Sequence, residues 1–387
     1  MPVSRRSFVR MLGGGGVGAF AVPALSFVSG RGQEALAADG WRGQAGLPPA
    51  PDLLRLDSNE NPRGPFPSVM QAIRDALGGA ARYPYQVSTD LRAAIAAAHR
   101  VAPENVLIGC GSGESLRVAV DTWCSATRSL VTAAPTYEGP VNRAVAMGIP
   151  VRAVRVGADL ALDLDAMAAA APGAGVVFLC NPNNPTGTVH GTAAVRAFVD
   201  QVARTSEAVV VVDEAYHEYC VHPDYASALP LALATPRVVV IRTFSKAYGL
   251  AGLRVGYAIG HRDAIAAMQK HRLANGVNQL GGAAAIAALR ADAAELARER
   301  ALNAEGLAIA TRFFRDAGFA VAPSHANFVY VDVHRDVRRV QEAARARGVL
   351  VGRPFPPLAS HLRVSIGTAD ELRAALPIIG QVLTATT

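Results

Sequence analysis

The sequence predicts an α/β protein with two parts. In the large domain a mixed, mostly parallel sheet lies between helices, and a smaller α+β domain follows at the C-terminus. From about residue 104 to 260, short apolar runs alternate with Ala-rich segments of helical periodicity, as in sheets covered by helices. After residue 275 a long helical run precedes mixed strand and helix patterns. With 387 residues, 51% of them hydrophobic, the chain can bury a core of this size.

Residues 1–37 have the features of a twin-arginine export signal. The paired Arg5 and Arg6 precede a weakly apolar, glycine-rich stretch, and Ala35 and Ala37 form a small-residue cleavage pattern. A short membrane anchor is the alternative, but the glycines and a proline make this stretch a poor spanning helix. We therefore expect cleavage, no stable membrane insertion afterwards, and a periplasmic or otherwise extracytoplasmic location. A cytoplasmic location is the alternative.

The rest of the chain is expected to form an arm and two domains. The proline-rich residues 38–65 are predicted to be an extended arm, residues 66–275 the large domain and residues 276–387 the small domain. Apolar runs predict strands in the large domain; these runs are residues 105–110, 129–134, 150–156, 175–180, 208–214, 237–243 and 255–260. In the small domain a helical run to about residue 315 precedes three expected strands and a last helix; the strands are residues 327–333, 348–352 and 361–367.

Charge and cysteine usage exclude several kinds of site. The net charge of +7 is spread along the chain, without the basic run and interleaved aromatic residues that nucleic-acid binding favours. The four cysteines show no C-x-x-C spacing, so we expect buried thiols rather than a disulfide framework. His217, Cys220 and His222 could suggest a metal, but their spacing matches no usual metal site. We expect no metal and no nucleic acid.

A single lysine in a small-residue loop is the strongest chemical signal. Of 38 basic residues, only Lys246 and Lys270 are lysines. Arginine stays protonated, whereas lysine can lose its proton and attack a carbonyl carbon. A lone lysine is more often an exposed surface residue, and the helical surface pattern around Lys270 fits that interpretation. Lys246 instead has Ser245 beside it, glycines that allow close approach of a ligand, and Arg254, whose guanidinium suits a phosphate.

Other polar residues follow the ends of the expected strands, where ligands bind in such sheets. The Gly/Ser loop at residues 111–114 precedes a helix and is either an anion site or an ordinary turn. Tyr137 could stack on a planar ring or serve packing. Two X-Pro steps fix an extended loop and present Asn184 rigidly. Asp213 ends a four-valine strand, as a helix cap or a functional charge, with Tyr216 three residues later.

Together these groups match the needs of pyridoxal phosphate. Lys246 suits the aldehyde, and Asp213 suits the protonated ring nitrogen that makes the ring an electron sink. The ring oxygen needs hydrogen-bond donors, which Asn184 and Tyr216 can supply. The phosphate needs a binding loop and a positive charge, which are supplied by Gly111, Ser112, Gly113, Ser245 and Arg254.

The order of motifs resembles the fold-type I enzymes of the class I/II aminotransferases, in particular the histidinol-phosphate aminotransferases. The resemblance runs from "LDSNENPRGPFP" to "LRVSIGT", residues 56–368, and includes "YPY", "GSGE", "PTY", "NPNNPTG", "DEAY" and "SKAYGLAGLRVG". It implies an aspartate aminotransferase-like fold of type I with a pyridoxal phosphate-binding large domain.

The resemblance also implies roles for individual residues. Lys246 would form the Schiff base and carry the proton between the substrate Cα and the cofactor. Tyr83 would reach the cofactor phosphate of the other subunit, which implies a homodimer with shared active sites. Asn61, Arg353 and Arg363 would bind substrate. The rest of the cofactor shell would be Gly111, Ser112, Gly113, Glu114, Tyr137, Asn184, Asp213, Tyr216, Ser245 and Arg254.

The expected activity is transfer of an amino group from an amino acid or histidinol-phosphate-like donor to a 2-oxo acid, with 2-oxoglutarate as the expected acceptor. The alternative with the same cofactor is a lyase, decarboxylase or cyclase acting on an amino acid. A binding protein without catalysis is a third possibility, against which the intact set of Lys246, Asp213 and Arg254 argues. Two features depart from the histidinol-phosphate aminotransferases and bear on the substrate. The segment "RPFPP" follows Gly352, and an export signal is unusual for an enzyme of histidine biosynthesis.

Overall fold

The computed structural model describes residues 53–291 and 293–385. The predicted export signal and the arm up to residue 52 lie outside these ranges. Among the described residues, no helix is both long and apolar enough to cross a membrane.

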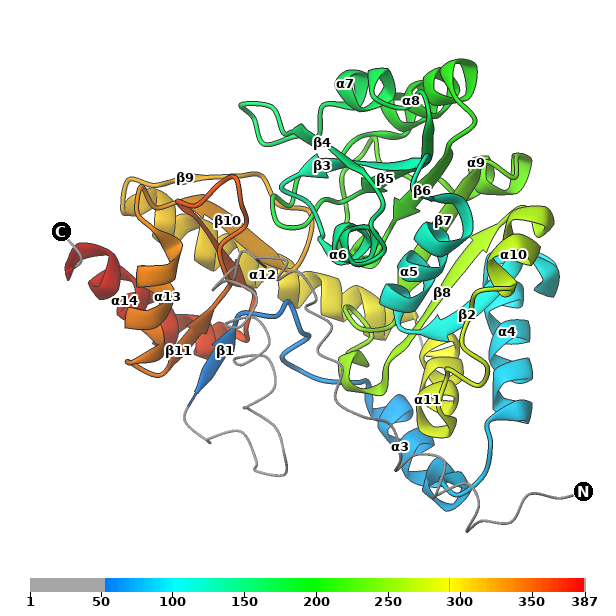
Figure 1. Ribbon diagram of the computed structural model, residues 1–387. Coiled ribbons are helices and arrows are strands. Elements are labelled where there is room, and N and C mark those ends of the chain that lie inside the picture. The colour runs from blue at the N-terminus through cyan, green and yellow to red at the C-terminus, as the bar shows by residue number, and fades with distance from the viewer. Residues whose placement is uncertain (1–52, 292, 386–387) are drawn as a thin grey trace, which may run out of the picture. The chain divides into compact units, whose positions relative to one another are not determined.

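A seven-stranded sheet forms the centre of the large domain (Figure 1), in the strand order β2-β8-β7-β6-β5-β3-β4. Only β8 runs antiparallel to its neighbours β2 and β7, and the other pairs are parallel. The predicted mixed, mostly parallel sheet is therefore confirmed. The bounds are β2 (Val106–Cys110), β3 (Ser129–Ala134), β4 (Val151–Arg155), β5 (Ala174–Cys180), β6 (Val209–Asp213), β7 (Val238–Thr243) and β8 (Val255–Gly260).

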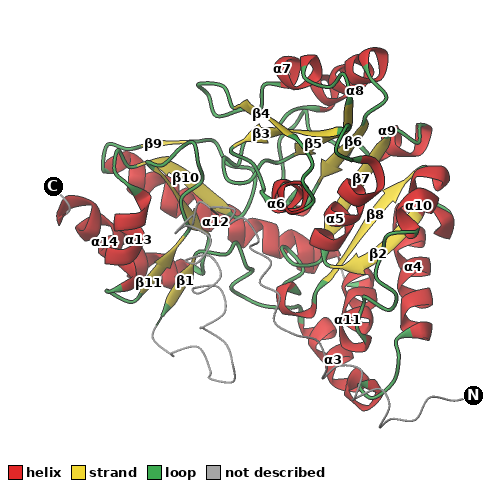
Figure 2. Cartoon of the chain, in the orientation of Figure 1, coloured by secondary structure: helices red, strands yellow, loops and turns green. Residues whose placement is uncertain are grey.

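Helices cover both faces of this sheet (Figure 2), because alternate side chains of each strand point to opposite faces. In β5, Val176 and Phe178 pack in one core with three helices, and Val177 and Leu179 pack in another on the opposite face. The first face carries α5 (Ser112–Trp123), α6 (Gly139–Ala146) and α10 (Arg262–Gln269). The second carries α7 (Leu164–Ala169), α8 (Thr192–Thr205) and α9 (Leu229–Ala234), with α3 (Pro67–Ala76), α4 (Tyr85–His99) and α11 (Gln279–Arg290) beside β2 and β8.

The smaller C-terminal part has a core of its own. Its three-stranded antiparallel sheet has the order β12-β10-β9, and β1 pairs in parallel with β11. The strands are β1 (Leu54–Leu56), β9 (Ala320–Val321), β10 (Phe328–Asp332), β11 (Val349–Val351) and β12 (His361–Ser365). The helices are α12 (Ala293–Asp316), α13 (Val337–Arg345) and α14 (Ala369–Ala385).

Two details differ from the sequence analysis. The helical run expected to reach about residue 315 is divided into α11 and α12, because Ala291 has extended backbone angles (φ −56°, ψ 148°). The segment expected to be only an extended arm contains β1, whose three residues pair with β11. The boundary predicted at residue 276 stays a prediction. Short 3-10 turns complete the fold at Leu77–Gly79, Pro103–Asn105, His217–Tyr219 and Ala251–Leu253.

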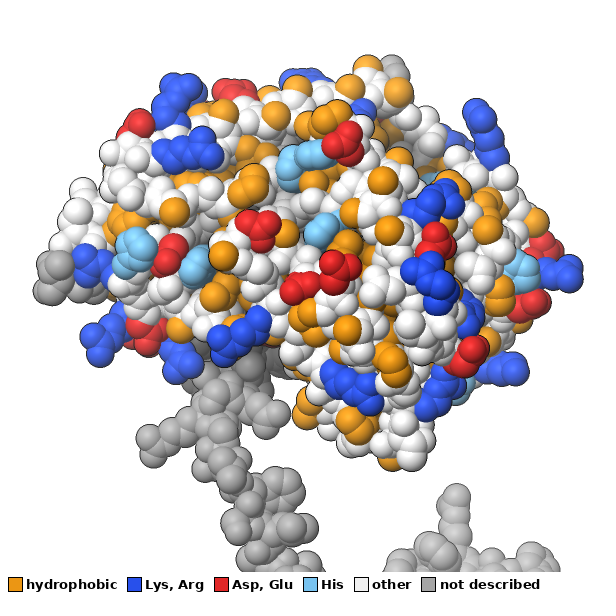
Figure 3. All heavy atoms as spheres, turned by 90° about the horizontal axis from the view of Figure 1, so that it is seen from above, with side chains coloured by type: hydrophobic (Ala, Val, Ile, Leu, Met, Phe, Trp, Pro, Cys, Tyr) orange, Lys and Arg blue, Asp and Glu red, His pale blue; other side chains and the backbone are white. Residues whose placement is uncertain are grey.

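The surface seen in Figure 3 mixes charged side chains of both signs with apolar ones. Basic and acidic groups lie close to one another across this face rather than in separate fields. This distribution agrees with the modest net charge of +7.

Candidate active site

A cavity of about 560 Å³ opens at the carboxyl ends of β2, β3, β5, β6 and β7, where ligands bind in sheets of this kind. The loops after these strands contribute polar residues, and the segment after β1 and the residues around β11 and β12 complete the wall. The lining residues include Asp57, Ser58, Asn59, Glu60, Ser112, Gly113, Tyr137, Asn184, Asp213, Tyr216, Ser245, Lys246, Arg254, Gln341, Val351, Arg353, Phe355 and Arg363.

Lys246 extends into this cavity from the loop after β7. Its Nζ donates to the backbone carbonyls of Ser58, at 3.3 Å, and Asn59, at 3.1 Å. Desolvation and the charge of Arg363 lower the pKa of Lys246 to about 8, although Glu60 and Asp213 oppose the shift. The amine can therefore lose its proton near neutral pH, which a nucleophile or general base requires.

Asn59 holds the carbonyl that faces Lys246. It is 1% exposed and has a φ of 53°, a conformation that asparagine adopts more readily than most residues. Ser365 Oγ accepts from its backbone N–H at 2.8 Å and donates to its Oδ1 at 2.9 Å, and Asn59 Nδ2 donates to Tyr216 Oη at 3.0 Å. Asn59 was not among the predicted site residues, although the motif "SNENP" contains it. One residue thus positions both Lys246 and Tyr216.

An anion-binding cradle lies at the N-terminus of α5. Ser112 and Gly113 begin that helix, whose first N–H groups and dipole favour an anion. Arg254 Nη1 donates to Ser245 Oγ at 3.4 Å beside them. Gly111 has a φ of +76°, and a Cβ there would collide with the guanidinium of Arg254. These backbone N–H groups, a hydroxyl and a guanidinium are the donors that a phosphate monoester needs.

Asp213 provides a carboxylate on β6. It is 3% exposed, and its Oδ1 accepts from the Ala215 N–H at 3.1 Å. Burial raises the pKa of Asp213 to about 7, against the lowering effects of the Ala215 hydrogen bond and Lys246. Without a further positive charge this carboxyl would be only partly ionised near neutral pH. A protonated ring nitrogen would supply that charge, so Asp213 fits the predicted partner.

Arg363 on β12 lies across the cavity from the sheet's loops and is 7% exposed. Its Nη1 donates to Asn184 Oδ1 at 2.7 Å and its Nη2 to the Asp57 carbonyl at 2.6 Å. Its Nε is buried and has no protein partner. Burial lowers the pKa of Arg363 to about 10. A buried guanidinium with an unused donor beside Lys246 is a site for an anionic substrate group.

Three residues predicted for the site lie elsewhere in the described chain. The Glu114 carboxylate does not line the cavity, because it accepts from the N–H groups of Cys110 (2.5 Å) and Leu273 (2.6 Å). Asn61 does not line it either, since its amide donates to the Ala247 carbonyl at 3.0 Å and accepts from the Arg63 N–H. Both side chains stabilise loops. Tyr83 is 73% exposed and away from this cavity, so its predicted role depends on a second subunit.

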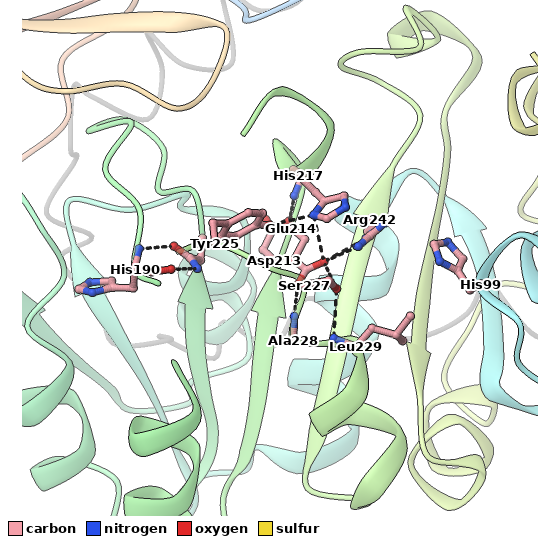
Figure 4. A network of polar contacts seen from close by, with 12 residues as sticks. His99, His190, Asp213, Glu214, His217, Tyr225, Ser227, Ala228, Leu229 and Arg242 are labelled. Atoms are coloured by element: carbon pink, nitrogen blue, oxygen red, sulfur yellow. Dashed lines mark hydrogen bonds and ion pairs between the residues drawn. The ribbon is translucent and has the colours of Figure 1, made fainter. Parts of the chain in front are cut away.

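A buried polar network lies next to Asp213 (Figure 4). Glu214, 1% exposed, accepts from Arg242 Nε (3.0 Å) and Nη2 (2.8 Å) and from Ser227 Oγ. Its Oε1 also accepts from the Ala228 N–H at 2.7 Å. His217 lies at its edge and contacts Tyr225, with Nδ1–Oη at 3.0 Å. No group of three metal-ligating side chains occurs among the described residues. The network fixes the loop that follows Asp213.

The lowered pKa of Lys246 can be measured directly, because the chain has only one other lysine. In the cofactor-free form of a Lys270→Arg variant labelled with ¹⁵N-lysine, we expect the remaining side-chain amine to titrate at about 8, its neutral fraction rising with pH through that value. Adding Arg363→Gln removes a nearby positive charge and should raise this pKa. A titration near the ordinary value of 10.5 in both proteins would contradict the desolvated site.

Comparisons with known proteins agree with this geometry. A model of the family described as "Aminotransferase class I and II" matches residues 51–379. A histidinol-phosphate aminotransferase of Moorella thermoacetica is 38% identical over 337 residues, which cover 86% of each chain. An aromatic amino acid aminotransferase of Mycolicibacterium paratuberculosis is 42% identical over 335 residues, covering 84% of this chain and 91% of that protein. The structure of histidinol-phosphate aminotransferase from Sinorhizobium meliloti in complex with pyridoxal-5'-phosphate has a TM-score of 0.81 at 31% identity, covering 86% of this chain and 91% of that one.

These findings confirm the aspartate aminotransferase-like fold of type I and the similarity to histidinol-phosphate aminotransferases. The family model spans nearly all of the described residues. The chain therefore belongs to the class I and II aminotransferase family and is a pyridoxal phosphate-dependent transaminase.

Proposed function

We propose that this cavity binds pyridoxal phosphate and that the enzyme moves an amino group from an amino acid or histidinol-phosphate-like donor to a 2-oxo acid, with 2-oxoglutarate as acceptor. One observation carries the proposal: Lys246, Asp213 and the anion-binding cradle face one cavity of about 560 Å³. The cradle consists of Ser112, Gly113, Ser245 and Arg254. The relatives named above act on donors of both kinds by their names.

The residues present fit the cofactor group by group. Ser112, Gly113, Ser245 and Arg254 would hold the phosphate, and Asp213 the ring nitrogen. Asn184 Oδ1 accepts from Arg363 and Tyr216 Oη accepts from Asn59, so the amide N–H groups of Asn184 and the hydroxyl proton of Tyr216 remain as donors for the ring oxygen. Tyr137 would cover one ring face. When bound, pyridoxal phosphate serves as an electron sink for the bond broken at the donor's Cα.

Lys246 performs the proton transfer in this proposal. With a pKa lowered to about 8, its Nζ can take the proton from the donor's Cα and release it again. The Ser58 and Asn59 carbonyls accept from Nζ and orient it within the cavity. Arg363 would hold the anionic group of the donor, a carboxylate or a phosphate, through its unpaired Nε.

The test is a titration of the purified protein, loaded with pyridoxal phosphate, by single donors without acceptor. The panel contains histidinol phosphate and aromatic, basic and acidic amino acids. We expect at least one donor to change the visible spectrum of the bound cofactor and to release its oxo product once per site, and 2-oxoglutarate to restore the spectrum. Continuous product formation without any oxo acid would instead indicate a lyase, decarboxylase or cyclase.

We propose that the enzyme is a homodimer in which Tyr83 reaches the partner's cofactor phosphate. Tyr83 and Tyr85 are 73% and 65% exposed, and their ring centroids lie 5.7 Å apart in a tilted arrangement, an aromatic surface typical of subunit interfaces. Sedimentation should give twice the monomer mass, and Tyr83→Phe should weaken cofactor binding in a fluorescence titration. A monomer with unchanged cofactor affinity would contradict the proposal.

We propose export through the twin-arginine signal, which lies outside the described residues. The support is the pattern of Arg5 and Arg6 before a weakly apolar stretch. Lys replaces Arg poorly where a fixed guanidinium geometry is read, so Arg5→Lys with Arg6→Lys should keep the protein in the cytoplasmic fraction. Equal fractionation of the double variant and the unchanged chain would favour the cytoplasmic alternative.

A further inference from the structure

We propose that Asn327 is a positioning residue for Lys246, because its side-chain amide shares the backbone carbonyl of Asn59 with the Lys246 amine. By occupying part of that carbonyl, Asn327 weakens the hold of the protein on the protonated amine and keeps Lys246 available as a base. The inference rests on the proposed function, because it concerns the proton transfer that Lys246 performs there. Asn327 is not among the residues that line the cavity, so it acts through Asn59.

Two donors meet at the Asn59 carbonyl. Lys246 Nζ donates to this oxygen at 3.1 Å, and Asn327 Nδ2 donates to it at 3.0 Å. Asn327 Nδ2 also donates to the Glu60 carbonyl at 3.3 Å. Because both groups that face the amide are acceptors, its NH₂ end and not its oxygen must point at them. The amine of Lys246 and the amide of Asn327 are therefore neighbours on a single acceptor.

Asn59 is held in place independently of Asn327. Ser365 Oγ accepts from the Asn59 N–H at 2.8 Å and donates to Asn59 Oδ1 at 2.9 Å. Asn59 Nδ2 donates to Tyr216 Oη at 3.0 Å. These hydrogen bonds fix both the backbone and the side chain of Asn59. Removal of the Asn327 amide should therefore leave the carbonyl beside Lys246, with one donor fewer.

The shared carbonyl determines the direction of the effect on Lys246. A hydrogen bond from the protonated amine to a carbonyl favours the charged form. A second donor on the same oxygen competes for its lone pairs and places a positive hydrogen beside the amine, which disfavours the charged form. Asn327 thus acts in the same direction as desolvation and Arg363, which lower the pKa of Lys246 to about 8. The other charged groups that act on this pKa are Glu60 and Asp213, which raise it, and Arg254, which lowers it.

The surroundings of Asn327 argue against a role in packing alone. The residue is 1% exposed, and its Oδ1 is buried without a hydrogen-bond partner among the described residues. A buried polar atom without a partner costs folding free energy. The neighbours in the chain, Ala326 and Phe328, lie in one buried apolar cluster with Tyr216. A polar side chain at position 327 is explained by the carbonyl that its amide shares with Lys246.

The test measures the pKa of Lys246 by ¹⁵N NMR in the cofactor-free Lys270→Arg protein described above. Asn327→Leu removes the amide and should raise this pKa by about 0.5 to 1, the equivalent of one hydrogen bond. In the cofactor-loaded enzyme, Asn327→Leu should lower kcat at pH 7 about 3- to 10-fold, because a smaller fraction of the amine is neutral. KM for the donor should change little, and the difference in kcat should narrow as the pH rises.

Asn303→Leu is the matched control. Asn303 is 3% exposed, and its Nδ2 donates to the Ala326 carbonyl at 3.1 Å. The variant also removes a buried amide from a backbone carbonyl, one residue before Asn327, but the carbonyl that faces Lys246 keeps both of its donors. Asn303→Leu should therefore leave the pKa of Lys246 and the pH dependence of kcat unchanged. Asn327→Ala repeats the measurement with a smaller side chain, in case leucine prevents folding.

The inference is overturned if neither Asn327→Leu nor Asn327→Ala raises the pKa of Lys246, or if Asn303→Leu raises it by as much. The NMR titration requires no donor, acceptor or cofactor, so it decides the role of Asn327 separately from the proposed function. The donor titration described above decides the proposed function, since its outcome does not depend on the pKa of the cofactor-free protein.

Discussion

Replacing Lys246 with alanine should lower kcat for transamination by at least about 10⁴-fold. This is the upper end of what a positioned general base contributes, and we expect at least this loss because the variant also lacks the amine that contacts the cofactor. Lys246→Arg should lose as much activity. Arginine keeps the positive charge opposite the Ser58 and Asn59 carbonyls but cannot release its proton. Steady-state rates with the best donor would measure both variants, with each protein saturated with pyridoxal phosphate.

Lys270 provides the control for this experiment. It is exposed and lies at the C-terminal end of α10, so Lys270→Arg should leave kcat unchanged. Borohydride reduction followed by peptide mapping should find the pyridoxyl group on the peptide containing Lys246, and none in Lys246→Ala. Turnover of Lys246→Ala within tenfold of the unchanged enzyme, or a label on Lys270, would show that the assignment of Lys246 is wrong.

Much of this site could be predicted because it depends on strand ends. In a mostly parallel sheet the loops after β2, β3, β5, β6 and β7 all open on one edge. Asp213 ends β6, the residues Ser112, Tyr137, Asn184 and Lys246 follow the other strands, and all five line one cavity. The alternation of apolar runs and helical segments places the strands to within one or two residues of their observed bounds, which is sufficient to bring these side chains together.

Contacts between segments far apart in the chain could not be predicted in this way. Asn59 meets Lys246 across 187 positions, and Glu138 meets Arg353 across 215. No local periodicity reports which distant backbone carbonyl or carboxylate will lie opposite a side chain. Glu114 shows the same dependence: the resemblance implied a cofactor contact for it. Whether its carboxylate faces the cavity or the Cys110 and Leu273 N–H groups depends on the tertiary fold.

The largest effect on stability is expected at Glu214. Glu214→Ala should lower the free energy of unfolding by about 3–5 kcal/mol, the usual cost of removing one partner from a buried ion pair. It leaves Arg242, 6% exposed, without its carboxylate, and the Ser227 hydroxyl and Ala228 N–H without their acceptor. Urea unfolding should show this as a lower midpoint. The proteins should be compared without added cofactor, because a ligand of the folded state would mask part of the difference.

Two further variants separate the buried charge from the rest of the network. Glu214→Leu combined with Arg242→Met removes both charges and should recover a large part of the lost stability, because a buried pair replaced as a whole costs much less than one broken in half. Asp370→Ala breaks an exposed pair with Arg373, in which the Asp370 side chain is 94% exposed, and should leave the midpoint unchanged. If Glu214→Ala unfolds at the same urea concentration as Asp370→Ala, then water already reaches Arg242 in the folded protein. The loop that follows Asp213 would then be held by β6 and by the Ala215 hydrogen bond rather than by the Glu214 network.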